Sequence, residues 1–181
     1  NSLNCDIFHI GYLMLLDYFD TVLEDGTTPM SKLLQKIQSL GIKTSIDVVS
    51  ESSGRFFTVV NSALKYCDYV IINEIEIGAI TGEMVRNEQE ELIDSGVKKA
   101  MQKLFSLGVK EKVIVHCPEK GFCLDRNGNF TVVDSIKLKK GFIKGSVGAG
   151  DAFCAGASIG LTYGKTFAEA IEIGSHLAAS V

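Results

Sequence analysis

Two kinds of hydrophobic pattern alternate along the chain. Short runs of apolar and β-branched residues predict strands, and the stretches between them carry apolar residues three and four positions apart, as amphipathic helices do. Met30, Leu33, Leu34 and Ile37 show this helical spacing. The pattern predicts strands at 5–13, 43–49, 68–73 and 111–117, and helices at 29–40, 56–67, from 74 onward and at 92–107.

Turn and capping signals mark the ends of these elements. Thr28-Pro29 supplies a helix N-cap and a first-turn proline, and Gly41 ends the helix that follows. Asn127-Gly128 is a strong two-residue turn signal, so we expect 121–125 and 129–136 to pair as a hairpin. Two more helices are expected, one starting near Asp151 and one after Thr166.

Strands that alternate with helices of this length predict a mostly parallel sheet with helices on both faces. The late hairpin adds antiparallel strands at one edge. We therefore expect an α/β fold, a three-layer α/β/α sandwich, with residues 1–181 forming a single domain without internal repeats.

Composition narrows the class of protein. The 181 residues are 46% hydrophobic and 22% charged, as in ordinary globular proteins, and the net charge of -4 argues against a general nucleic-acid binder. No apolar run approaches the ~18 residues that a membrane-spanning helix needs, and no signal-peptide pattern opens the chain. The five cysteines lack metal-ligand spacing, so we expect reduced, mostly buried thiols in a cytoplasmic protein.

Both ends of the sequence interrupt predicted elements. Asn1 is not a start methionine and leads almost at once into a strand, and the last helix reaches Val181 without a glycine or proline stop signal. We therefore expect the sequence to be a fragment of a longer chain.

The stretch Gly148-Ala149-Gly150-Asp151 opens a predicted helix and is the first candidate site. Glycines let successive backbone N–H groups converge on an anion, and a helix N-terminus adds unpaired donors and partial positive charge. This geometry suits a transferring phosphoryl group. Asp151 beside it could accept the proton of an attacking hydroxyl. The alternative is an ordinary glycine turn with an acidic helix cap.

The second candidate is Asn73 with Glu76, at the point where a strand changes into a helix. Residues three apart share a face of the first helical turn, so an amide and a carboxylate there could hold Mg²⁺ through its water ligands. The alternative is a capping box, in which Asn73 and Glu76 bond to each other's backbone. The two interpretations are compatible, because a cap still exposes both side chains.

Other phosphate motifs fit the sequence less well. GxxxxGK[ST] is absent, which argues against a P-loop. The glycines at 145, 148 and 150 read GxxGxG, and Phe153 stands where the third glycine of a dinucleotide-binding GxGxxG would be.

Taken together, VGAGDAFCAG and NEIE, in this order and on this α/β framework, resemble the ribokinase-like (PfkB) carbohydrate kinase family. Asp47 in SIDVVSE resembles the family's aspartate on a central strand. The resemblance implies transfer of the γ-phosphoryl group of ATP, with Mg²⁺, to a hydroxymethyl group of a sugar or related alcohol. It implies that Asp151 is the base, that Gly148, Ala149 and Gly150 form the anion hole, that Asn73 and Glu76 position phosphate and Mg²⁺, and that His116, Pro118 and Gly121 contribute to the nucleotide pocket.

The sequence departs from the family pattern at three places. Gly145 and Ser146 replace the usual Asp-Thr, which puts a monovalent-cation site in doubt. Pro118 stands in the nucleotide loop and lacks a backbone N–H, although Gly121 keeps a close backbone approach open. The family's N-terminal strands, its lid and its extreme C-terminus are absent from these residues.

The resemblance leaves the partners partly open. It implies a small-molecule acceptor and ATP, no nucleic acid and no membrane, and a homodimer in the full-length protein, since the lid often pairs between subunits. A nucleoside or vitamin kinase of the same fold is an alternative. A nucleotide-binding regulatory protein with little turnover is another.

Overall fold

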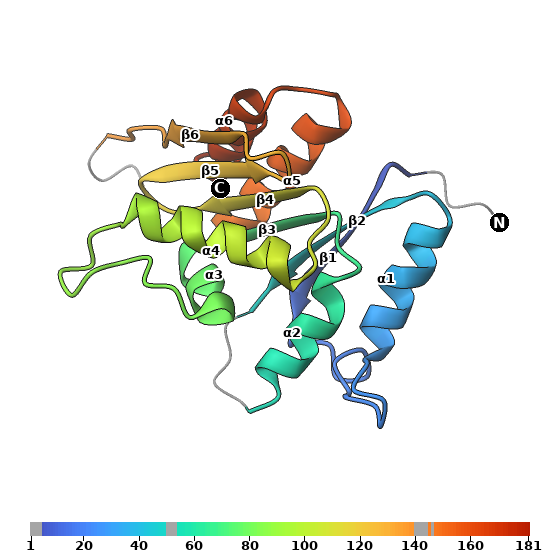
Figure 1. Cartoon of the computed structure of the whole chain (residues 1–181). Coiled ribbons are helices and arrows are strands. Elements are labelled where there is room, and N and C mark those ends of the chain that lie inside the picture. Colours follow the sequence, from blue (N-terminus) through green and yellow to red (C-terminus); the bar gives the residue numbers. More distant parts are fainter. Residues whose placement is uncertain (1–4, 50–53, 140–144, 146) are drawn as a thin grey trace.

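The computed structural model describes residues 5–49, 54–139, 145 and 147–181, and a six-stranded sheet runs through them. Neighbouring strands in the sheet follow the order of the sequence, β1 to β6 (Figure 1). The first four strands are parallel, and β5 and β6 are added antiparallel as a hairpin. The strands are β1 (Ile7–Leu13), β2 (Lys43–Val48), β3 (Tyr69–Asn73), β4 (Lys112–His116), β5 (Lys120–Asp125) and β6 (Phe130–Asp134).

Helices cover both faces of the sheet, which confirms the predicted three-layer α/β fold. The first four helices lie on one face, and α5 and α6 lie together on the other (Figure 1). The helices are α1 (Pro29–Ser39), α2 (Phe56–Leu64), α3 (Glu74–Thr81), α4 (Asp94–Leu107), α5 (Ala149–Thr162) and α6 (Phe167–Ala178).

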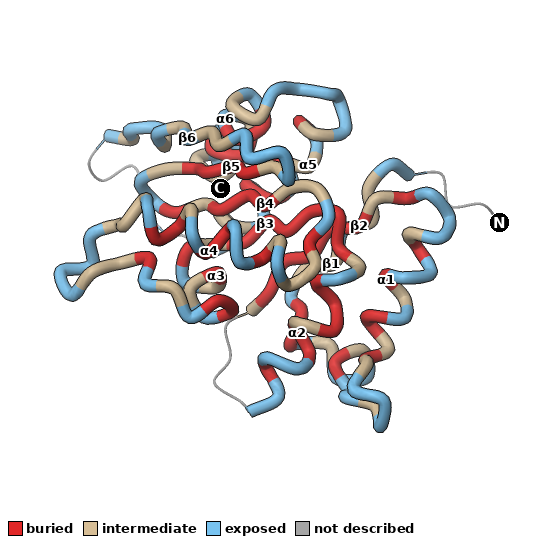
Figure 2. Tube along the Cα trace, viewed as in Figure 1, coloured by how far each residue is buried: buried red, intermediate tan, exposed pale blue. Residues whose placement is uncertain are grey.

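The period-two alternation of the strands divides the core between these two layers. On β3, Ile72 packs into the larger cluster with α1 to α4, and its neighbour Ile71 packs into the smaller cluster beneath α5 and α6. On β4, Val113 likewise packs into the larger cluster and Ile114 into the smaller one. The central strands are buried on both faces, as Figure 2 shows, which explains why they read as continuous apolar runs.

The capping and turn residues lie where the sequence analysis expects them, and the start of one helix differs by two residues. Thr28 caps α1 in a capping box with Ser31, and Gly128, with φ 91°, lies in the turn between β5 and β6. The helix expected near Asp151 begins two residues earlier, at Ala149. Gly148 is its N-cap with φ 87°, a left-handed conformation that residues with a Cβ rarely adopt.

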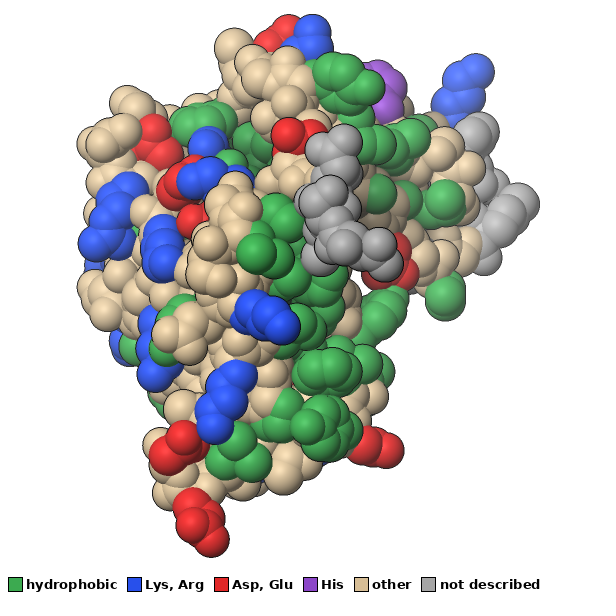
Figure 3. Space-filling view, turned by 90° about the vertical axis from the view of Figure 1, so that its right-hand side faces the viewer, with side chains coloured by type: hydrophobic (Ala, Val, Ile, Leu, Met, Phe, Trp, Pro, Cys, Tyr) green, Lys and Arg blue, Asp and Glu red, His purple; other side chains and the backbone are tan. Residues whose placement is uncertain are grey.

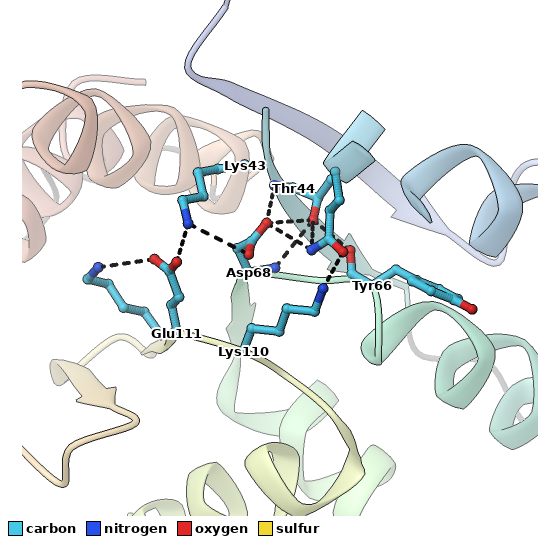
Figure 4. Close-up of polar contacts among 8 residues, drawn as sticks. Lys43, Thr44, Tyr66, Asp68, Lys110 and Glu111 are labelled. Atoms are coloured by element: carbon cyan, nitrogen blue, oxygen red, sulfur yellow. Dashed lines mark hydrogen bonds and ion pairs between the residues drawn. The ribbon is translucent and has the colours of Figure 1, made fainter. Parts of the chain in front are cut away.

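A polar network ties together the amino ends of β2, β3 and β4 (Figure 4). The buried carboxylate of Asp68 accepts hydrogen bonds from the backbone of Thr44 and the side chain of Gln38, both at 2.9 Å. Lys43 pairs with Glu111 beside it. This end of a parallel sheet is opposite the ligand-binding end, so the network serves stability.

Two further features concern membrane-spanning helices and the cysteine thiols. No helix in the described part of the chain has the length and apolar character to cross a bilayer. The five cysteines are free thiols, and four of them are buried, as expected from the sequence.

Candidate functional site

The N-terminus of α5 lies beside the carboxyl ends of β3 and β4, where ligands bind in α/β folds. Three of the six described helices have N-termini closed by a capping box, namely α1, α3 and α6. In contrast, α5 starts from Gly148, which has no side chain to cap the helix. The N–H groups of that turn therefore stay available to an anion.

The position of α5 is fixed by close packing against α6. A Cβ on Gly156 would lie 2.8 Å from the Cα of Gly174, and a Cβ on Gly160 would lie 2.8 Å from the Cα of Ala170. Both distances are too short for a real side chain, so the small residues allow the two helices to touch. This contact places the first turn of α5 rigidly on the sheet.

A pocket of about 450 Å³ opens next to this first turn. Its walls come from the ends of β3 and β4, the segment after β6, the start of α5 and the end of α6. Apolar surface exceeds polar surface in this pocket, and its polar side chains include Asn73, His116 and Ser135. The described residues that line it are Asn73, Glu74, Ile75, His116, Cys117, Pro118, Ser135, Ile136, Leu138, Gly145, Ala149, Gly150, Phe153, Ser175, Ala178, Ala179 and Val181.

His116 lies between the pocket and α5. Burial lowers the pKa of His116 to about 4, so the imidazole is neutral at neutral pH. Its ring centroid is 4.7 Å from that of Phe153, and a Cβ added to Gly150 would come within 3.4 Å of its Cε1 atom. The histidine therefore packs directly under the glycine turn and fixes its height above the sheet.

Asn73 and Glu76 form the capping box that the sequence analysis gave as the alternative to a metal site. The Asn73 side chain accepts from the backbone N–H of Glu76 at 2.8 Å, and the Glu76 carboxylate accepts from the backbone N–H of Asn73 at 2.9 Å. The cap uses one oxygen of Glu76. Burial raises the pKa of Glu76 to about 7, and the charge of Asp47 adds to this rise.

Asp47 brings a second buried carboxyl group to the same region. It lies near the end of β2 and accepts a hydrogen bond from the backbone N–H of Val48 at 2.7 Å. Burial raises the pKa of Asp47 to about 6, and the charge of Asp151 raises it further. Asp47, Glu76 and Asp151 therefore share one electrostatic environment, although no three acidic, His or Cys side chains of the described residues converge closely enough to hold a metal by themselves.

Asp151 occupies the third position of α5 and is exposed. The hydroxyl of Tyr12, from β1, donates to one of its carboxylate oxygens. Among the described residues, those lining the pocket lie on the β4 side of Asp151, and Tyr12 approaches it from the β1 side. The carboxylate thus stands at the border between the pocket and the surface along β1.

The structure brings most of the predicted site residues together, and Gly121 does not join them. Gly121 is not among the described residues that line the pocket; a Cβ there would lie 2.3 Å from the side chain of Ile171, so the glycine makes room for α6. Ser146 lies outside the described residues, and its neighbour Gly145 lines the pocket.

Sequence reasoning missed two side chains of this region. One is Tyr12, for which the isolated Gly11 within a strand pattern was an available signal, because such a glycine suggests a bulge. The other is Arg86, whose guanidinium bonds to Glu74 at 2.6 Å and pairs with both carboxylate oxygens of Glu119 at 2.9 Å. Arg86 thereby ties the start of α3 to the loop after β4. No local sequence motif predicts this contact, because Arg86 is 12 positions from Glu74 and 33 positions from Glu119.

The comparisons with known proteins agree with this fold. The family model for pfkB family carbohydrate kinases matches residues 18–181. A ribokinase of Arabidopsis thaliana is 26% identical over 130 residues. A solved structure of Arabidopsis thaliana ribokinase, complexed with ribose and ATP, superimposes with a TM-score of 0.68 at 19% identity. An adenosine kinase of Schistosoma mansoni, complexed with 2-fluoroadenosine, superimposes with a TM-score of 0.74 at 17% identity.

These relatives are longer than the chain. The sequence match covers 72% of the chain and 32% of the Arabidopsis ribokinase. The structural matches cover 83% of the chain and 45% of the ribokinase structure, and 97% of the chain and 49% of the adenosine kinase. The chain therefore spans about half the length, or less, of the proteins it resembles.

Proposed function

The chain belongs to the pfkB family of carbohydrate kinases, and on that basis we propose that it carries the donor site and the catalytic base of a Mg²⁺- and ATP-dependent small-molecule kinase. The acceptor is a hydroxymethyl group of a sugar or related alcohol. One observation carries the proposal: an uncapped helix N-terminus opens onto a largely apolar pocket, with Asp151 beside it.

The donor site follows from the shape and charge of the pocket. Its apolar walls suit an adenine ring, and the start of α5 in one wall offers the phosphates the N–H groups of Ala149, Gly150 and Asp151. The neutral His116 adds no charge of its own beneath this turn. The arrangement favours a nucleoside triphosphate over a donor without a base, such as pyrophosphate.

The metal site follows from the buried carboxyl groups. Asp47 and Glu76 have raised pKa values because they are buried close to other acidic groups, and a divalent cation would relieve this cost. Carboxylate oxygens, phosphate oxygens and water are the ligands that Mg²⁺ prefers. When bound, Mg²⁺ neutralises charge on the phosphates.

Asp151 acts on the acceptor. Its carboxylate accepts the proton of the acceptor hydroxyl as the new O–P bond forms and the bond between the γ-phosphorus and the bridging oxygen breaks. The first turn of α5 stabilises the charge that spreads over the γ-phosphoryl oxygens. Asp151 is exposed on the β1 side, which leaves room for an acceptor that approaches from the side opposite the pocket.

The experiment uses the protein as its gene encodes it. Thermal shift with ATP and with pyrophosphate, each with and without Mg²⁺, is followed by a phosphorylation screen over sugars, polyols, nucleosides and vitamin alcohols. We expect MgATP to raise Tm, pyrophosphate to have little effect, and one acceptor class to give turnover. Nucleotide binding without turnover on any acceptor would favour the regulatory alternative, and no nucleotide binding would refute the donor site.

A further inference from the structure

One contact of Asp151 has no role in the proposed function. The hydroxyl of Tyr12 donates to Oδ2 of Asp151 over 2.5 Å, between residues 139 positions apart in the sequence. Among the described residues, Tyr12 is the side chain that donates to this carboxylate. The bond therefore joins the edge strand β1 directly to the first turn of α5.

The backbone of β1 deforms at this position. Ile10 pairs with Ile46, and Leu13 pairs with Val48, so β1 uses one residue more than β2 between the two pairs. Tyr12 takes up the difference with φ 59°, a left-handed conformation that is strained for a residue with a Cβ. Such outliers persist where the surrounding structure holds them, and they cluster at functional sites.

The residue that follows Tyr12 anchors the strand beyond the bulge. Leu13 is fully buried, and its carbonyl accepts from the backbone N–H of Val49 at 3.0 Å. With the strand anchored beyond the bulge, the Tyr12 side chain is turned out of the normal alternation and toward α5. Figure 3 looks onto the side of the molecule with β1 and α1, where hydrophobic side chains gather on the surface. Tyr12, Leu15 and Tyr18 are exposed in this segment.

The hydroxyl is suited to donate and not to accept. Its hydrogen bond to Asp151 raises the pKa of Tyr12, and the charges of Asp47 and Glu76 act in the same direction. The phenol therefore keeps its proton in the range where a kinase works. A donor fixed on one carboxylate oxygen restricts the rotation of the group and leaves the other oxygen to face a ligand.

We propose that Tyr12 is a positioning residue, which holds Oδ2 of Asp151 so that Oδ1 faces the hydroxyl group of the acceptor. This inference rests on the proposed function, because it assigns Tyr12 a role that acts through the catalytic base. The strained bulge of β1 exists, on this account, to bring the phenol to the start of α5.

A double-mutant cycle tests the proposal in the protein as its gene encodes it. Tyr12→Phe keeps the ring and removes the hydroxyl, so kcat should fall about 10- to 100-fold with the KM for ATP unchanged. In the Asp151→Asn background the same change should cause little further loss. Tyr18→Phe is the matched control, because this ring is 73% exposed and packs edge-on against Phe19, and it should leave kcat unchanged.

Two outcomes would overturn the positioning role. One is an unchanged kcat in Tyr12→Phe. The other is an equal loss from Tyr12→Phe whether residue 151 is aspartate or asparagine, since a merely structural tyrosine would act independently of the base. Circular dichroism and Tm of each variant check that the fold is intact.

A second measurement needs no turnover, so it separates this inference from the proposed function. NMR of protein labelled at the Cζ carbon of tyrosine follows the ionisation of each phenol, and the Tyr12 signal is the one missing in Tyr12→Phe. Asp151→Asn should lower the pH at which Tyr12 ionises. An unchanged Tyr12 titration would refute the contact even if the protein phosphorylates an acceptor, and a lowered one would support it even if no acceptor is found.

Discussion

Replacing Glu76 by glutamine should stabilise the protein at alkaline pH while weakening its response to Mg²⁺. Burial raises the pKa of Glu76 from 4.5 to about 7, so the folded state binds this proton more tightly than the unfolded state does. Stability is then greatest below the unfolded pKa and is lost as the pH rises to the folded value. The shift corresponds to roughly 3 kcal/mol of unfolding free energy at pH values above about 7.

Glutamine removes this cost and keeps the local structure. Its amide oxygen can accept from the backbone N–H of Asn73, as the Glu76 carboxylate does at 2.9 Å, so the capping box of α3 survives. We expect the variant to be more stable by up to about 3 kcal/mol near pH 8 and by less than about 1 kcal/mol near pH 4.5. Urea unfolding at both pH values measures the difference.

The control is Glu169→Gln, which alters the same capping-box position on α6. Glu169 is exposed, and hydrogen bonds from Thr166 lower the pKa of its carboxyl group, so the substitution should bring no gain near pH 8. Mg²⁺ should raise the stability of the wild type more than that of Glu76→Gln. Equal gains in stability from Glu76→Gln and Glu169→Gln, or a gain from Glu76→Gln that does not depend on pH, would show that burial does not raise the pKa of Glu76.

Three other substitutions have separate expected effects, two beside the site and one at the opposite end of the sheet. Arg86→Met should destabilise the protein by about 3–5 kcal/mol because it leaves the buried Glu74 without its partner, and chemical denaturation measures this loss. Gly148→Ala should cost about 1–2 kcal/mol, since φ is 87° and a Cβ there meets no other atom, and it should weaken ATP binding measured by calorimetry. Asp68→Asn should lower the unfolding free energy by about 1–3 kcal/mol, because the buried group loses its charge 3.9 Å from the ammonium group of Lys43. It should change neither KM, because Asp68 lies at the opposite end of the sheet from the site; urea unfolding and initial rates measure the two effects.

The sequence predicts the elements of this fold because their signals are local. Thr28 and Pro29 begin α1 as expected, and Asn127-Gly128 forms the turn of the hairpin. The parallel order of the strands also follows, since a helix between two strands supplies the crossover connection that parallel pairing needs. The start of α5 was placed two residues late, because a glycine N-cap gives no side-chain signal.

The site was predictable only in part, because several of its contacts join residues far apart in the chain. The glycine turn and the Asn73–Glu76 pair are contiguous motifs, and the sequence contains both. The bond from Tyr12 to Asp151 spans 139 positions, and it depends on a bulge whose place is set by the pairing of β1 with β2. Gly121 was assigned to the nucleotide by resemblance, whereas its lack of a side chain accommodates α6. The hydrophobic periodicity of a strand predicts which face of the sheet a residue occupies, but it does not predict which helix packs against that face.

The central claim is that Asp151 acts on the acceptor and not on the nucleotide. The most direct measurement compares Asp151→Asn with the wild type in the protein as its gene encodes it, with ATP affinity determined by calorimetry and phosphoryl transfer by the acceptor assay. The account predicts an affinity for MgATP within a few-fold of the wild type and a transfer rate lower by at least about 100-fold. A variant that binds MgATP and transfers phosphate at the wild-type rate would contradict it.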